Sequence, residues 1–83
     1  MMTEQHAFDR VITILKPYVK DPRALAAATM ETTLLKDLEV NSARLVDVVL
    51  EIEDKFDISV SDKDADKVRT IGDAVSLVVA MSA

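Results

Sequence analysis

Apolar side chains recur at helical spacing in three stretches of the chain, with polar side chains between them. Residues 3–16, 42–56 and 70–79 each place apolar residues three and four positions apart, which is the spacing of one helical face. The chain has one glycine and two prolines, so tight hairpins are poorly supplied. We therefore predict an all-α fold, a small bundle of three main helices with one or two short helices and a long first loop.

The first helix is expected to begin near Thr3, whose hydroxyl can cap it. It should end or kink just before Pro17, because proline removes a backbone hydrogen bond and clashes with the preceding turn. Lys20 to Val40 forms the long connection, in which Asp21 and Pro22 resemble the cap and first residue of a short helix over residues 23–28. The expected core residues of this connection are Leu25, Met30, Leu38 and either Leu34 or Leu35.

The central helix is expected to run from Ser42 to Phe56. Leucine at position 50 lies between the buried and charged faces, where it suits a docking surface; a wider core stripe is the alternative. The expected buried stripe is Leu45, Val48, Val49, Ile52 and Phe56. The expected charged face is Arg44, Asp47, Glu51 and Asp54, and Val46 and Leu50 lie between the two faces.

Two capping pairs mark the last part of the chain. Ser61 with Asp64, and Thr70 with Asp73, each place a hydroxyl residue three positions before an acid, which is typical of a helix start. These pairs predict a short helix that ends near Lys67 and a final helix after Thr70. The expected inward face of the final helix is Ile71, Ala74, Val75, Val78 and Val79.

The composition limits the possible functions. The chain has no cysteine, which excludes disulfides and cysteine metal or redox sites. It shows no secretory signal and no apolar run of roughly 18 residues, so we predict no membrane span, a cytoplasmic location and a single domain over residues 1–83. A net charge of −5 argues against a nucleic-acid partner. Ten acids between residues 37 and 66 should attract basic partners: Asp37, Glu39, Asp47, Glu51, Glu53, Asp54, Asp57, Asp62, Asp64 and Asp66.

A catalytic site is poorly supported by the residue types present. A serine nucleophile needs a nearby base, and the only histidine is His6 near the start of the first helix. Gly72 stands alone, so the chain has no glycine-rich loop to hold a phosphate. We therefore predict no catalytic residues.

A calcium loop is an alternative for the acidic stretch after residue 61. Asp62, Asp64 and Asp66 match its first three liganding positions. Lys67 and Asp73 stand where such a loop needs glycine and glutamate. We therefore predict no metal site, with a solvated helix start as the interpretation of these acids.

Ser42 remains as the candidate functional residue. Asn41 and Ser42 are both good helix caps, and a purely structural role for either residue is one interpretation. If Asn41 caps the helix, the Ser42 hydroxyl can point to solvent. A phosphodiester attached there would lie against the free N–H groups and the positive end of the helix. Our hypothesis is that Ser42 is an attachment point for a carried group.

Several stretches resemble the acyl carrier protein family. The run Asp37-Leu38-Glu39-Val40-Asn41-Ser42 resembles the family's segment around its modified serine. Residues 46–58 resemble the recognition helix, and residues 60–62 and 67–75 resemble the third and fourth helices. The resemblance is ungapped over about residues 33–79. The family usually has Asp-Ser-Leu where this chain has Asn41-Ser42-Ala43 followed by Arg44, which favours a specialised carrier.

The resemblance implies that a phosphopantetheinyl transferase attaches 4′-phosphopantetheine from coenzyme A to Ser42. The arm would hold acyl intermediates as thioesters for fatty acid, lipid or specialised acyl-chain biosynthesis. The implied partners are this transferase and acyltransferase, synthetase or ketosynthase enzymes with basic docking patches, and the chain itself would act as a monomer that catalyses nothing. The implied docking residues are Asn41, Ala43, Arg44, Val46, Asp47, Leu50, Glu51 and Asp54. The implied acyl-chain pocket is Leu45, Val49, Phe56, Val60, Val68 and Ile71. The alternative is a helical interaction adaptor without a prosthetic group.

Overall fold

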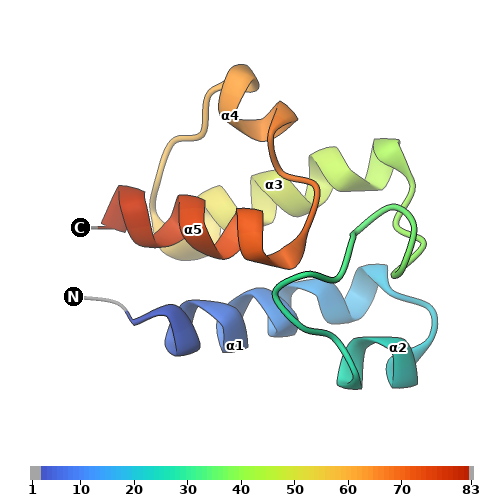
Figure 1. Ribbon diagram of the computed structural model, residues 1–83. Coiled ribbons are helices and arrows are strands. Elements are labelled where there is room, and N and C mark those ends of the chain that lie inside the picture. Colours follow the sequence, from blue (N-terminus) through green and yellow to red (C-terminus); the bar gives the residue numbers. More distant parts are fainter. Residues whose placement is uncertain (1–2, 83) are drawn as a thin grey trace.

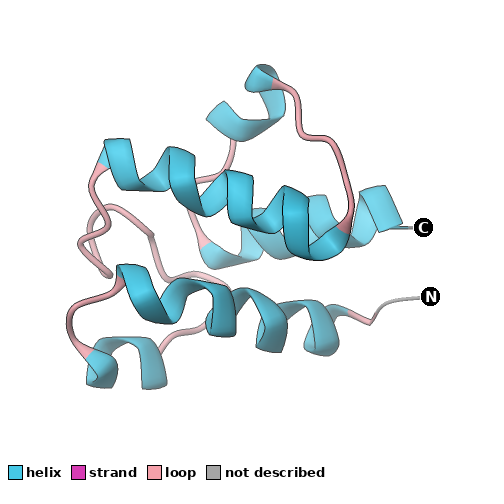
Figure 2. Ribbon diagram, turned by 180° about the vertical axis from the view of Figure 1, so that it is seen from behind, coloured by secondary structure: helices cyan, strands magenta, loops and turns pink. Residues whose placement is uncertain are grey.

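The computed structural model describes residues 3–82 and is built from helices and loops (Figure 1). The long helices are α1 (Glu4–Leu15), α3 (Ser42–Phe56) and α5 (Ile71–Ser82), and the short ones are α2 (Pro22–Ala26) and α4 (Asp62–Asp66). A 3₁₀ turn, η1 (Lys16–Tyr18), follows α1. The view from behind shows the same arrangement, with α1 running opposite to α3 and α5 (Figure 2). The predicted all-α fold, with three main helices and one or two short ones, is confirmed, and the short α-helices are two, α2 and α4, within residues 3–82.

Side-chain caps fix where the helices begin. The Thr3 hydroxyl accepts a hydrogen bond from the His6 N–H at 3.1 Å, and Asp21 and Ser61 cap α2 and α4 in the same way. Asn41 caps α3, so Ser42 is the first helical residue. Each cap satisfies a backbone donor that has no partner inside its own helix. The observed starts of α1, α3 and α4 confirm those expected from the sequence.

Pro17 ends α1 by tightening the backbone. The helix stops at Leu15 and continues as the 3₁₀ turn η1, in which Pro17 occupies an early position. The short helix predicted over residues 23–28 is observed slightly earlier, as α2 over Pro22–Ala26. The chain then leaves α2 through a turn in which the Ala28 N–H donates to the Leu25 carbonyl.

The core is a single layer of apolar side chains between the long helices. Leu34 and Leu38 of the long loop are buried within it, whereas Leu35 turns outward and is 50% exposed. Leu45 is only partly buried, although its position in the helical pattern predicted full burial. Within residues 3–82 no polar or charged side chain is buried. The largest fully buried side chains are Leu15, Leu34, Ile71, Val11, Val40, Val48, Val75 and Val78.

The long loop is joined to the start of α5 by backbone hydrogen bonds. Thr33 and Thr70 form an isolated antiparallel bridge, flanked by a bond from the Leu34 N–H to the Arg69 carbonyl at 2.9 Å. The Gly72 N–H donates to the Met30 carbonyl at 2.7 Å, and a Cβ at position 72 would lie only 2.6 Å from that oxygen. Glycine is therefore required for this close approach of two backbones.

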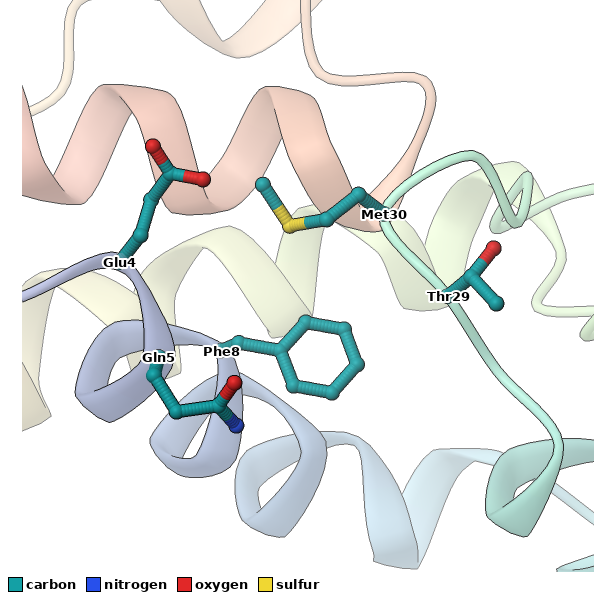
Figure 3. A pocket seen from close by; sticks show the side chains of 5 residues that line it. All are labelled: Glu4, Gln5, Phe8, Thr29 and Met30. Atoms are coloured by element: carbon teal, nitrogen blue, oxygen red, sulfur yellow. The ribbon is translucent and has the colours of Figure 1, made fainter.

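The Met30 side chain also extends from the long loop toward α1 (Figure 3). This side chain and the Phe8 ring project into the space between α1 and the loop, where a cavity of about 280 Å³ is lined by Glu4, Gln5, Phe8, Thr29 and Met30 (Figure 3). Both Phe8 and Met30 are partly buried against the core. The loop therefore packs on α1 as well as on α5.

Candidate functional site

Ser42 lies exposed at the start of α3. The Asn41 carboxamide oxygen accepts a hydrogen bond from the Arg44 N–H at 2.9 Å, and the Asn41 carbonyl accepts one from the Leu45 N–H at 2.9 Å. Asn41 therefore provides the cap, and the Ser42 hydroxyl has no hydrogen-bond partner within the described part of the chain. The N–H groups of Ser42 and Ala43 also have no acceptor among residues 3–82. The hydroxyl therefore stands beside unpaired donors at the positive end of a helix.

The segment before Ser42 is held in a fixed path. Asp37 and Thr33 bond to each other twice: the Thr33 N–H donates to Asp37 at 2.8 Å, and the Asp37 N–H donates to the Thr33 hydroxyl at 3.0 Å. The bond from the Thr33 N–H is the main cause that lowers the pKa of the Asp37 carboxyl below its ordinary value. The Val40 N–H then donates to the Leu34 carbonyl at 2.9 Å. These bonds direct the chain into Asn41 at a defined angle.

Glu39 adopts an unusual backbone conformation in this segment. Its φ angle of 55° lies in the left-handed region, which glycine or asparagine adopts more readily than glutamate. Leu38 and Val40 on either side are buried, so the backbone turns at Glu39 between two anchored residues. The turn immediately before the helix cap therefore carries backbone strain.

A groove of about 400 Å³ begins at Ser42 and runs between α3 and α4. Four of the side chains predicted for an acyl-chain pocket line it, namely Leu45, Val49, Val60 and Val68. The other two, Phe56 and Ile71, are buried in the core but do not line this groove. Residues that the sequence did not place here also line it: Leu35, Glu53, Asp62, Ala65 and Asp66.

Phe56 and Ile71 have other neighbours. Ile71 is the first residue of α5, and its N–H donates to the Thr32 carbonyl of the long loop at 3.0 Å. Phe56 is the last residue of α3 and lies under the Arg10 guanidinium, 4.3 Å from the ring centre. Arg10 also donates to the Lys55 carbonyl at 2.7 Å, which closes the end of α3. Local sequence gave no signal for this contact between residues 45 positions apart.

The exposed side of α3 carries two neighbouring stripes. Val46 and Leu50 form an apolar stripe along the groove, and they are 60% and 56% exposed. Asp47, Glu51 and Asp54 form an acidic stripe, because positions three and four apart share a helix face. Glu51 is partly buried where α3 meets α1, and Asp47 and Asp54 are exposed. Of the remaining residues predicted for docking, Asn41, Ala43 and Arg44 are exposed beside Ser42.

Other sequence features do not form a second chemical site. Asp62, Asp64 and Asp66 belong to the helix α4, where the Ser61 hydroxyl accepts from the Asp64 N–H, so their backbone does not form a calcium-binding loop. Within residues 3–82 no three acids or histidines are grouped as metal ligands would be. His6 is exposed in the first turn of α1.

The arrangement around Ser42 has a clear chemical capacity. An exposed hydroxyl stands at a helix start with unpaired N–H groups, next to an apolar groove and a charged helix face. Such a site can hold an esterified phosphate through the helix end and shelter an apolar chain beside it. No histidine is among the residues that line the groove, and no described side chain is hydrogen-bonded to the Ser42 hydroxyl as a base that activates it would be. Among residues 3–82, none of the helices has the length and apolar character needed to cross a bilayer.

Comparisons with known proteins show which proteins the whole chain resembles. A family model described as a phosphopantetheine attachment site matches residues 19–78. The chain is 30% identical over 77 residues to the acyl carrier protein of Lactobacillus acidophilus, covering 93% of this chain and 94% of that protein. It is 33% identical over 78 residues to the acyl carrier protein of an Exiguobacterium species, covering 94% and 95%.

Two further comparisons extend the similarity. A putative mitochondrial acyl carrier protein of Schizosaccharomyces pombe is 34% identical over 71 residues, which are 83% of this chain and 61% of that protein. The solved structure of the acyl carrier protein from Enterococcus faecalis superimposes with a TM-score of 0.79 at 31% identity, covering 98% of this chain and all of the other.

Proposed function

The chain belongs to the acyl carrier protein family, with its phosphopantetheine attachment domain, and from this premise we propose that Ser42 is the attachment point. Proteins of this family carry acyl groups on a covalently attached 4′-phosphopantetheine and do not catalyse their transfer. When bound, this group supplies a thiol that holds an acyl chain as a thioester. The single observation that carries the assignment is the free, exposed Ser42 hydroxyl at the first position of α3.

The residues around Ser42 are compatible with the prosthetic group. Its phosphodiester is an anion, and the unpaired N–H groups of Ser42 and Ala43 at the positive helix end favour an anion there. Asn41 supplies the cap through a neutral carboxamide, so no carboxylate of the cap opposes the phosphate. The exposure of Ser42 gives a transferase access to the hydroxyl.

The groove beside Ser42 supplies shelter for an apolar cargo. Leu45, Val49, Val60 and Val68 form its walls, and burial of an acyl chain against them would gain roughly 25 cal/mol for each Å² of apolar surface removed from water. We propose that this groove protects the acyl chain when the carrier is free. A specialised acyl-chain pathway, besides fatty acid or lipid synthesis, agrees with Asn41, Ala43 and Arg44 around the serine.

The exposed face of α3 is the proposed docking surface for partner enzymes. The acidic stripe attracts basic patches, and Val46 and Leu50 give an apolar contact at its edge. The partners of this class are a phosphopantetheinyl transferase and acyltransferase, synthetase or ketosynthase enzymes.

The test is loading with coenzyme A and a broad-specificity phosphopantetheinyl transferase, followed by intact mass measurement. Native protein should gain the mass of one phosphopantetheine, and Ser42→Ala should gain none. Ser59→Ala is the matched control, because Ser59 is exposed and caps no helix, and it should load fully. Both variants should keep the helical circular dichroism of the native protein, since exposed substitutions usually change stability by less than about 0.5 kcal/mol.

Two results would reject the assignment. Native protein that gains no mass with several transferases would favour an interaction adaptor without a prosthetic group. A full mass gain on Ser42→Ala would place the attachment on another residue.

We also propose that the carrier acts as a cytoplasmic single-domain monomer. Residues 1–2 and 83, at the ends of that domain, lie outside the described residues. Light scattering at micromolar concentration should give a mass near 9.1 kDa. A mass twice as large would reject the monomer.

A further inference from the structure

The helix face that carries the acidic stripe of α3 has one basic residue, Arg44, at its start. Arg44 precedes Asp47 by three positions and Glu51 by seven, so it lies on the same face at the end nearest Ser42. Its side chain does not turn down the helix to Asp47. The Arg44 guanidinium instead lies over the Tyr18 ring of η1, 5.1 Å from the ring centre. Among residues 3–82 no carboxylate oxygen lies within 4.0 Å of it.

The helix α3 itself does not favour arginine at this position. A cation in the first turn of a helix opposes the positive end of the helix dipole, and the first turn of α3 contains no acid to balance it. The Tyr18 ring compensates through a cation–π contact, which also fixes the direction of the guanidinium. The Arg44 charge therefore lies near the proposed attachment site, exposed and held in a fixed direction, and no carboxylate of the described residues pairs with it.

The start of α3 lies at the same end of the bundle as η1, so Arg44 gives that end of the docking face a positive charge (Figure 1). The docking face is thus bipolar: it is basic at Arg44 and acidic from Asp47 onward. A surface of one sign cannot match both parts, because a like charge placed opposite either part weakens binding.

We propose that Arg44, positioned by the Tyr18 ring, is a specificity-determining residue for partner enzymes. It selects enzymes that place a carboxylate opposite position 44 and basic residues opposite Asp47 and Asp54. Enzymes with a uniformly basic docking surface are disfavoured. The inference rests on the proposed function of Ser42, since loading of that serine is the reaction by which partners are compared.

The first experiment uses a phosphopantetheinyl transferase whose carrier-docking surface is uniformly basic. Its kcat/KM is measured on native carrier, Arg44→Asp and Lys20→Asp at low and high salt. Arg44→Asp should raise kcat/KM about tenfold by removing a like-charge contact, and the gain should shrink at high salt. Lys20→Asp changes the net charge by the same amount, and its kcat/KM should stay within about twofold of the native value.

A charge exchange tests the partner side. Basic docking residues of the transferase are changed one at a time to glutamate, and one of these variants should prefer native carrier over Arg44→Asp. Tyr18→Phe keeps the ring and should preserve that preference, whereas Tyr18→Leu should reduce it while Ser42 still loads.

The outcomes separate the two proposals. Equal responses of Arg44→Asp and Lys20→Asp, or no reversal with any exchanged transferase, would overturn the specificity role alone. Unchanged preference in Tyr18→Leu would overturn the positioning role of the ring. Failure of every carrier to load with any transferase would remove the premise at Ser42 and both proposals with it.

Discussion

Gly72→Ala should destabilise the fold at the contact between the long loop and α5. The added Cβ would lie 2.6 Å from the Met30 carbonyl oxygen, and this backbone oxygen cannot rotate aside as a side chain would. The two backbones must separate, which lengthens the bond of 2.7 Å from the Gly72 N–H and disturbs the adjoining bond from Ile71 to Thr32. Overpacking of this kind costs about 1–3 kcal/mol, and alanine recovers about 0.5–1 kcal/mol as a better helix residue.

Taking the middle of each range, the net loss is about 1 kcal/mol from a total that is about 4–12 kcal/mol for a domain of this length. Because about 1 kcal/mol shifts the melting temperature of such a domain by about 4–8 °C, Gly72→Ala should melt lower by about that amount. Urea and thermal unfolding followed by circular dichroism measure both quantities. Ser76→Ala is the matched control, because Ser76 is exposed on the same helix and alanine there should cost nothing. A Gly72→Ala protein as stable as native would refute the close-approach argument.

Three further predictions concern the surface. Glu39→Gly should stabilise the fold by about 0.5–1 kcal/mol, since glycine relieves the left-handed strain at φ 55°; a lower urea midpoint would contradict this. Backbone N–H groups of Thr70 and Arg69 lower the pKa of Asp73, so its stabilisation is complete at neutral pH and is lost as the pH falls below about 4. Asp73→Asn should therefore cost about 0.5–1 kcal/mol at pH 7, the size of a partly solvated helix cap, and a cost that grows on acidification would disprove the sign. Asp47→Lys with Asp54→Lys should slow loading by a transferase with a basic docking surface by about tenfold without loss of stability, and equal slowing by the control Asp9→Lys with Glu31→Lys, which changes the net charge equally outside α3, would show a net-charge effect only.

The sequence predicted the helices well because their boundaries are local. The Asn41 and Ser61 side chains each accept a hydrogen bond from the backbone N–H three positions later. Pro17 ends the helix through the turn in which it lies. Such signals lie within one helical turn and are readable without knowing the fold. The expected exposure of Ser42 after a capping Asn41 is confirmed for the same reason, whereas its role as an attachment point stays a prediction.

The side chains lining the groove were harder to predict because they depend on the path of distant segments. Leu34 and Leu35 were equivalent in the sequence, and the buried one, Leu34, is the one whose backbone is bonded to the distant Arg69 and to Val40. Phe56 and Ile71 were placed in the pocket as part of the apolar seam between helices that the family resemblance implies, but they do not line the groove. They are directed into the core instead, and no local rule distinguishes a core side chain from one that lines a groove.

The direction of the helices has a practical consequence. The start of α1 and the end of α5 lie together at one end of the bundle, and α3 begins at the other (Figures 1 and 2). A tether attached at either terminus would therefore leave Ser42 pointing away from the surface that holds it. The carrier can be immobilised on a sensor or fused to a reporter from either side, and measurements of partner binding in both orientations should agree.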